Sequence, residues 1–115
     1  MLKLYGLRKC TTCKKAVAWL DDRKHPYSFT DVREEGVTKP QVSRWARAVG
    51  SWEKLINRAG YTWRGLKPSE TAGLTEEKAI ELAVKYPSLI RRPLIEHKDG
   101  TITTGFADKV RDLIG

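Results

Sequence analysis

Hydrophobic and polar positions at the start of the chain predict a strand, a helix and a second strand. Residues 2–5 alternate weakly and precede Gly6, a pattern typical of a short strand. The helix is indicated by apolar residues at i, i+3, i+4 and i+7: Cys13, Ala16, Val17 and Leu20. Residues 27–32 alternate again. A crossover of this length between two strands predicts that they are parallel.

The pattern changes to helical spacing in the middle of the chain. Two helices are indicated, one by Val42, Trp45, Ala46 and Val49, and a shorter one by Trp52, Leu55 and Ile56. Residues 57–67 contain Gly60 and Gly65 and are predicted to be irregular. Thr75 is a predicted cap for a further helix, which Pro87 ends. We expect the three tryptophans of this region to pack these helices.

The last part of the chain predicts two strands and a closing helix. Residues 92–96 resume strand character, and Asp99-Gly100 predicts a two-residue hairpin turn to an antiparallel strand at 101–104. The closing helix is indicated by Phe106, Val110, Leu113 and Ile114. The order is therefore β-α-β, a helical middle, then β-β-α, which is typical of an α/β fold.

Length and composition fit one domain that covers residues 1–115. Hydrophobic residues make up 40% of the chain, which is enough for a packed core and excludes global disorder. No run approaches the roughly 18 apolar residues of a membrane-spanning helix. The N-terminus lacks the apolar stretch and cleavage site of a signal peptide. We therefore expect a cytoplasmic monomer that does not contact the membrane.

Charge adds a preference for anionic partners. The chain has 22 lysines and arginines against 14 acidic residues, a formal net charge of +8. Five of these cations precede the first acidic residue, Asp21: Lys3, Arg8, Lys9, Lys14 and Lys15. Nucleic acid, an acidic protein or a small anion would suit such a surface. A soluble protein with surplus lysines is the simpler alternative on charge alone.

The only two cysteines, Cys10 and Cys13, form a Cys-x-x-Cys motif between the first strand and the first helix. Two cysteines three residues apart cannot form a secreted disulfide scaffold, so we expect them to act through their reactivity. Cys10 would lie where the unpaired N–H groups and dipole of the helix stabilise a thiolate. Basic neighbours at Arg8, Lys9 and Lys14 would lower its pKa further.

These positions predict different roles for the two thiols. Cys10 would attack, and Cys13, one turn later on the apolar face, would resolve the product. Either Thr11 or Thr12 could cap the helix. Cys13 could instead be a small buried hydrophobic residue. No metal site is expected, because structural zinc needs four ligands and the two histidines have no ligand-like spacing to the cysteines.

The chain resembles the arsenate-reductase-like family of thioredoxin-fold proteins, which includes the Spx regulators and the YffB-type thiol reductases. The resemblance is carried by Leu4-Tyr5-Gly6, Cys10, Lys15-Ala16, Trp19-Leu20, Leu55-Ile56-Asn57-Arg58-Ala59-Gly60, Thr62-Trp63-Arg64, Tyr86-Pro87-Ser88-Leu89-Ile90-Arg91-Arg92-Pro93 and Gly105-Phe106. It implies a thioredoxin-like core with a mixed sheet, at about 1–33 and 88–115. A helical insert would occupy about 34–87.

The resemblance also implies roles for individual residues. Cys10 matches the family's nucleophile, Arg92 the arginine before the cis-proline, and Pro93 that proline. Seven residues are predicted to contact the substrate: Arg8, Lys9, Thr11, Thr12, Arg58, Arg64 and Pro93. Glutathione is the expected co-substrate, and no bound cofactor is expected. Two further arginines of the glutathione-coupled arsenate reductases have no clear match, because Asn57 (beside Arg58) and Gly105 stand at those positions.

Three functions follow as hypotheses. The first is a thiol oxidoreductase in which the Cys10 thiolate attacks a disulfide, a glutathione mixed disulfide or a small oxidised substrate. The second is an Spx-like regulator in which the cysteine pair is a redox switch and the helical insert binds RNA polymerase. The third is arsenate reduction, which Gly105 disfavours.

Overall fold

The computed structural model describes residues 1–115 and contains one four-stranded sheet in the order β2-β1-β3-β4. β1 (Leu2–Gly6) and β2 (Tyr27–Asp31) are parallel, as predicted. β3 (Leu94–Glu96) pairs antiparallel with β1 and with β4 (Ile102–Thr104). The sheet is therefore mixed, which confirms the predicted α/β fold with its β-α-β and β-β-α parts.

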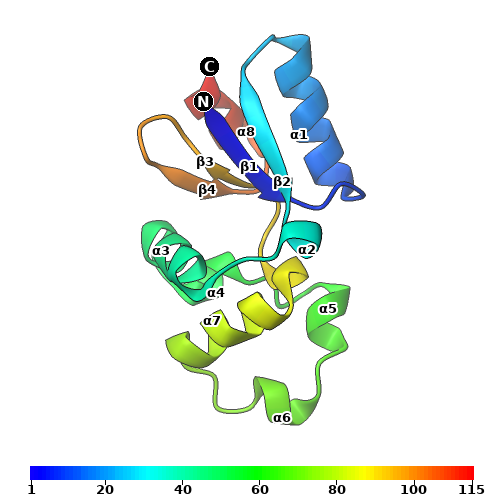
Figure 1. The fold of residues 1–115 in the computed structure, drawn as a ribbon, viewed down its shortest axis with the longest axis vertical. Helices are drawn as coiled ribbons and strands as arrows, with labels where there is room; N and C mark the ends of the chain where they lie inside the picture. The colour runs from blue at the N-terminus through cyan, green and yellow to red at the C-terminus, as the bar shows by residue number, and fades with distance from the viewer.

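Helices α1 (Thr11–Asp22) and α8 (Asp108–Ile114) pack on one face of the sheet (Figure 1). Side chains alternate along β1, so Leu2 and Leu4 both point to this face. The core there consists of six buried residues: Leu2, Leu4, Ala16, Leu20, Ile95 and Val110. This confirms the apolar stripe that the sequence predicts for the first helix.

The segment between β2 and β3 is helical and forms the lower half of the molecule in Figure 1. Its elements are α2 (Val32–Glu35), α3 (Lys39–Val49), α4 (Trp52–Leu55), α5 (Tyr61–Arg64), α6 (Pro68–Thr71), α7 (Glu76–Lys85) and the 3-10 helix η1 (Pro87–Leu89). A core of 15 buried residues joins these helices to Leu94 and Ile102 of the sheet. Trp45 is fully buried in this core, and Trp52 and Trp63 pack against it, which confirms the packing role predicted for the tryptophans.

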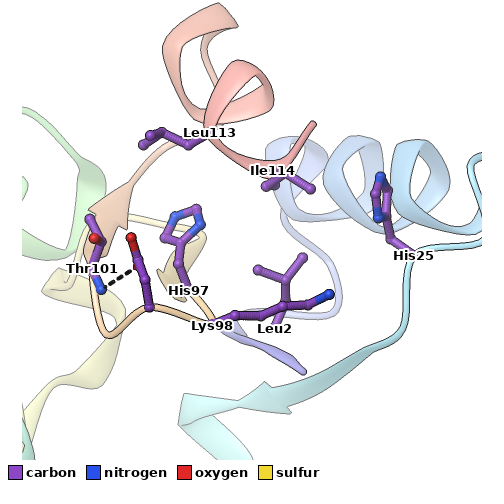
Figure 2. Close-up of a pocket in the computed structure, with 8 residues that line it drawn as sticks. Leu2, His25, His97, Lys98, Thr101, Leu113 and Ile114 are labelled. Carbon is purple, nitrogen blue, oxygen red and sulfur yellow. Dashed lines mark hydrogen bonds between the residues drawn. The ribbon is translucent and has the colours of Figure 1, made fainter.

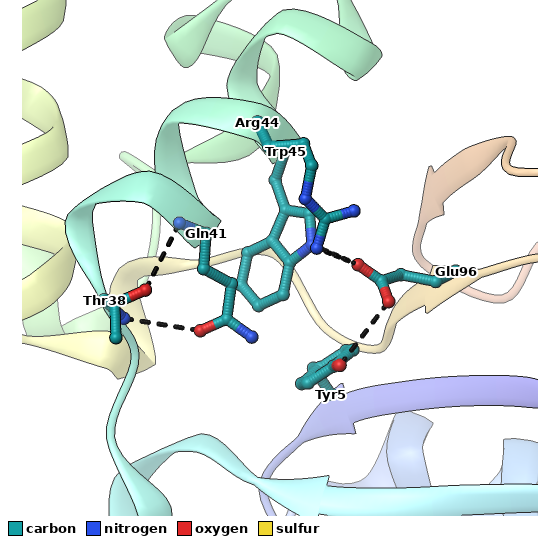
Figure 3. Close-up of polar contacts among 6 residues, drawn as sticks. All are labelled: Tyr5, Thr38, Gln41, Arg44, Trp45 and Glu96. Carbon is teal, nitrogen blue, oxygen red and sulfur yellow. Dashed lines mark hydrogen bonds and ion pairs between the residues drawn. The ribbon is translucent and has the colours of Figure 1, made fainter.

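A polar joint connects the helical half to the sheet (Figure 3). The Glu96 carboxylate of β3 accepts hydrogen bonds from Trp45 Nε1 at 2.8 Å and Arg44 Nη2 at 2.7 Å, both on α3. The Tyr5 hydroxyl of β1 donates to the same carboxylate at 3.5 Å, and the Tyr5 and Trp45 rings are 4.8 Å apart. Burial opposes ionisation of Glu96, but the bonds from Trp45 and Arg44 hold its pKa below the ordinary value.

The first helix begins differently from the prediction that Thr11 or Thr12 caps it. Thr11 is already the first helical residue, so Cys10 occupies the N-cap position, and no side chain caps the helix. The chain turns one residue earlier than expected because the Cys10 N–H donates to the Leu7 carbonyl at 3.0 Å. The cap predicted at Thr75 is confirmed, because its side chain accepts from the Lys78 N–H at 3.2 Å.

The hairpin between β3 and β4 has a three-residue loop rather than the predicted two. The His97 N–H donates to the Thr101 carbonyl at 2.8 Å, which leaves residues 98–100 in the loop. Gly100 has a φ of 90° and donates to the His97 carbonyl at 3.0 Å. A turn followed by one left-handed residue gives this longer hairpin, so the glycine signal was right and the loop length was wrong. Residues 57–67 were predicted to be irregular, but one helical turn, α5, forms within them.

Candidate functional site

The loop after β1 places Cys10 at the start of α1 with its side chain uncommitted. Cys10 has an extended backbone (φ −75°, ψ 126°), and its carbonyl accepts the first helical bond, from the Lys14 N–H at 2.9 Å. Its thiol makes no capping bond to the backbone of the first turn and is half-buried. The sulfur is therefore next to the positive end of α1 and remains free to react.

A buried carboxylate fixes the loop that carries Cys10. Asp31, at the end of β2, is the only buried charged residue of the chain. It accepts the Arg8 N–H at 2.9 Å and the first-turn N–H groups of α2, from Arg33 at 2.9 Å and Glu34 at 3.1 Å. These bonds, of which the one from Arg8 has the largest effect, hold the pKa of Asp31 below its ordinary value. The sequence showed Asp31 only as one residue of an alternating strand, so this role was missed.

The pKa of the Cys10 thiol lies below its ordinary value of 9.0. Burial alone would raise it, but three groups outweigh the burial. In order of their effect, these groups are the backbone N–H of Cys13, the guanidinium of Arg92 and the thiol of Cys13, each of which favours the thiolate. The positive charge of Arg92 acts in the same direction. The thiolate is therefore stabilised by a helix N–H group and by Arg92, which is more than 80 residues away in the sequence.

Cys13 lies in the opposite environment. Its side chain is 1% exposed, and burial raises the pKa of its thiol to about 12. The sulfur packs against the end of β1, where a Cβ built on Gly6 would lie 2.4 Å from Cys13 Sγ. Only glycine leaves room for this thiol. Both cysteines are free, and the Cys13 thiol remains protonated beside Cys10.

Arg92 reaches Cys10 from the segment before β3. The Arg92–Pro93 peptide bond is cis, which confirms the isomer that the family resemblance implies. Arg92 Nη1 donates to the Ser88 carbonyl, and its buried Nε has no partner. Pro93 is fully buried and its carbonyl accepts the Gly105 N–H at 3.0 Å. The proline therefore shapes the site, while its carbonyl is already engaged.

Cys10 and Arg92 share a hollow of about 260 Å³ between the sheet and the helical half. Its lining consists of Cys10, Thr12, Asn57, Ile90, Arg91, Arg92, Thr104 and Gly105. Two of these residues are arginines and none is acidic, so the hollow is electropositive. Of the predicted substrate contacts, only Thr12 lines this hollow; Arg92, which was predicted to be catalytic, lines it too, and Pro93 follows Arg92 but is not part of the lining.

Other predicted contacts lie elsewhere. Arg58 pairs with Glu53 at 3.4 Å, and Arg64 donates to the Ala59 carbonyl at 2.7 Å. Each guanidinium also lies over a neighbouring ring, that of Trp52 or Tyr61. Local pairing within the helical half therefore holds both arginines outside the hollow lined by Cys10. Lys9 and Thr11 are exposed and are not part of its lining either.

Arg8 lies on the other side of α1. It pairs with Glu34 at 3.4 Å and lines a groove of about 420 Å³ with Cys13, Lys14 and Phe29. Arg8, a predicted substrate contact, therefore lies on the Cys13 side of the motif and outside the hollow of Cys10. It left out Arg91, which lines the hollow of Cys10. The only signal for Arg91 was its place in the Arg91-Arg92-Pro93 run.

The histidines lie at the opposite end of β1 (Figure 2). His25 and His97 line a hollow of about 250 Å³ with Leu2, the first residue of β1. His25 stacks on Trp19, and His97 Nε2 is 2.8 Å from Thr103 Oγ1. No group of three or more histidine, cysteine, aspartate or glutamate side chains could hold a metal ion. No helix is both long and apolar enough to span a membrane.

Comparisons with known proteins agree with this fold. A solved structure named YFFB protein shares 37% identity and has a TM-score of 0.91, covering 99% of this chain and 98% of its own. This match confirms the thioredoxin-like fold. An arsenate reductase from Vibrio cholerae shares the fold at 15% identity, with a TM-score of 0.77 over 90% of this chain and 87% of its own.

Sequence relatives give the same picture. An uncharacterized protein of Haemophilus influenzae is 32% identical over 109 residues, covering 95% of this chain and 94% of the relative. The global transcriptional regulator Spx of Listeria innocua is 29% identical over 96 residues, which are 83% of this chain and 72% of Spx. The family model described as the ArsC family matches residues 5–112. The chain therefore belongs to the ArsC family.

Proposed function

We propose that this protein is a thiol oxidoreductase in which the Cys10 thiolate attacks a disulfide or a glutathione mixed disulfide. One observation carries the proposal: a half-buried thiol with a lowered pKa, free of other bonds, faces Arg92 in an electropositive hollow. A thiolate rather than a thiol is the attacking species, so the lowered pKa increases the reactive fraction at neutral pH.

The reaction consists of two balanced exchanges. The Cys10 sulfur forms a bond to one sulfur of the substrate disulfide, the substrate S–S bond breaks, and the other sulfur leaves as a thiolate with the electron pair. A second thiolate then attacks the mixed disulfide and releases Cys10. Glutathione suits the second step because its carboxylates match the positive hollow. Cys13 is less suited, because its thiol is buried and has a pKa of about 12.

Two other functions of the family are less favoured by the geometry. Arsenate reduction would use several arginines around the nucleophile, but Arg92 is the one arginine that lowers the pKa of Cys10, and the hollow presents Asn57 and Gly105 where two further arginines would stand. A redox-responsive regulator is supported by relatives named global transcriptional regulator Spx and by the paired cysteines. Binding of RNA polymerase that depends on the oxidation state of the pair would favour that second candidate.

The test is reduction of a small disulfide in the presence of glutathione, with glutathione reductase and NADPH reporting turnover. We expect activity in the native protein and in the Cys13→Ser variant, and none in Cys10→Ser. Intact-mass analysis should show a glutathione adduct on Cys10. Full activity in Cys10→Ser, or no adduct in the native protein, would contradict the proposal.

A further inference from the structure

Arg91 is the one arginine of the hollow whose side chain has no partner in the structure. Its side chain is exposed and makes no hydrogen bond or ion pair. The adjacent Arg92 is different, because it is half-buried, donates to the Ser88 carbonyl and favours the Cys10 thiolate across the hollow. Arg92 is therefore committed to the reacting thiol, while Arg91 can bind a group that enters from solvent.

The backbone holds Arg91 firmly at this place. Its N–H donates to the Leu55 carbonyl at 2.8 Å, and the preceding residue, Ile90, forms an antiparallel bridge with Ile56. The guanidinium thus extends from a fixed point at the edge of the hollow. No acidic residue lines the hollow and competes for it. An incoming carboxylate would be its first strong partner.

We propose that Arg91 selects anionic substrates by binding a carboxylate of the disulfide or thiol whose sulfur reacts with Cys10. This inference rests on the proposed function and adds the substrate class to it. The reaction is unchanged: Cys10 forms a bond to one sulfur of a carboxylate-bearing disulfide, and the other half leaves as a thiolate with the electron pair. Arg91 takes no part in bond making and acts only on the affinity for the charged group.

The test compares three disulfides of different charge, each reacting with the reduced protein. Glutathione disulfide is anionic, bis(2-hydroxyethyl) disulfide is neutral and cystamine is cationic. The rate constant for adduct formation on Cys10 is measured for each by quenching and mass analysis of the peptide. Each reagent has its own intrinsic reactivity, which cancels when a variant is compared with the native protein on the same reagent.

The variants are Arg91→Ala, Arg91→Glu and, as a matched control, Lys14→Ala. Lys14 is also an exposed cation near the motif, but it lines the groove on the Cys13 side of α1. We expect Arg91→Ala to slow the reaction with glutathione disulfide about three- to tenfold, the range for an exposed charge-assisted contact. The neutral reagent should be unaffected. Arg91→Glu should make the protein prefer the cationic cystamine over glutathione disulfide. Lys14→Ala should change the ratio of the anionic to the neutral rate constant less than about twofold, because solvent ions screen a charge at that distance.

The outcomes separate this inference from the proposed function. An unchanged anionic-to-neutral ratio in Arg91→Ala, or an equal loss in Lys14→Ala, would overturn the role of Arg91 and leave the oxidoreductase intact. An equal loss with all three reagents in Arg91→Ala would also overturn it, because the residue would then act on the thiol itself. A native Cys10 that reacts with none of the three would contradict the proposed function.

Discussion

The two sides of the start of α1 place the same chemical group in opposite environments. On one side Cys10 lines a hollow with two arginines and no acidic residue, and the pKa of its thiol is lowered. On the other side Cys13 lines a groove whose lining is mainly hydrophobic, and burial raises the pKa of its thiol to about 12. Only Thr11 and Thr12 separate them in the sequence, so their nearness to the start of the helix alone cannot explain the difference.

Residues outside the motif in sequence contribute to the contrast. Arg92, before β3, supplies a hydrogen bond and a charge to Cys10. Gly6, at the end of β1, provides the space that Cys13 fills, and Phe29 of β2 lies near the same spot. The reactivity of this motif therefore depends on Arg92 and Gly6 from outside it, together with the helix N–H group of Cys13 within it. Substitutions at these positions should each remove one contribution to the difference between the two thiols.

The largest effect is expected from exchanging the cysteines one at a time. Cys10→Ser removes the nucleophile and should lower thiol-transfer activity at least about a hundredfold, since loss of a nucleophile is rarely compensated. Cys13→Ser should stay within about threefold of the native rate, because a serine hydroxyl can still donate a hydrogen bond to the Cys10 sulfur. Steady-state reduction of a small disulfide with glutathione measures both. Equal losses would mean that Cys13 takes part as a nucleophile.

A smaller but still large effect is expected from Gly6→Ala. Its new methyl group would lie 2.4 Å from Cys13 Sγ, so the core must shift. We expect a loss of about 1–3 kcal/mol in the free energy of unfolding, measured by urea denaturation of the reduced protein. In a Cys13→Ala background, which lacks the sulfur, Gly6→Ala should lower the free energy of unfolding much less. Additive effects would show that the contact between Gly6 and Cys13 is not the cause.

Arg92 tests the other half of the comparison. Arg92→Ala removes a hydrogen bond and a charge that lower the pKa of Cys10, so this pKa should rise toward 9.0. At pH 7 the alkylation rate should fall about three- to tenfold, because a shift of one unit changes the thiolate fraction tenfold. The alkylation rates of the native protein and the variant should converge at alkaline pH, where Cys10 is ionised in both. A rate deficit that persists at high pH would indicate that Arg92 does not act through the pKa.

The smallest effect is expected at the polar joint, which serves as a control. Glu96→Gln weakens the bonds to Trp45 and Arg44 and should cost about 0.5–2 kcal/mol of unfolding free energy at pH 7. Because the pKa of Glu96 is lowered in the folded protein, its contribution is present above pH 4.5 and is lost as pH falls through the folded value. The difference should therefore shrink in acid. The alkylation rate of Cys10 should not change, and a change would show that the contrast depends on the joint.

Local patterns predicted the parts of this protein that depend on neighbouring residues. The stripe of Ala16 and Leu20, the cap at Thr75 and the parallel β1–β2 pair follow from spacing and were confirmed. The nucleophilic position of Cys10 was also visible, because a helix start is a local feature. The role of Arg92 beside Cys10 and the cis bond before Pro93 came from the family resemblance, since no local pattern shows either.

What the sequence could not show depends on pairing across the fold. Arg58 and Arg64 were expected at the site, but Glu53 and the Ala59 carbonyl hold them elsewhere. Arg91 was passed over, although its side chain is the free cation of the hollow. These three arginines differ in position and role because of the partners that the folded chain provides. Hydrophobic periodicity carries no information about such partners.

The measurement that tests the central claim most directly is the pH dependence of alkylation of each cysteine in the native, reduced protein. Peptide mass analysis reports Cys10 and Cys13 separately in one sample between about pH 5 and pH 10, a range that brackets the ordinary thiol pKa of 9.0. We predict a Cys10 midpoint below this value and a Cys13 that stays unmodified throughout. Two thiols that titrate together near the ordinary value, at similar rates, would contradict the account.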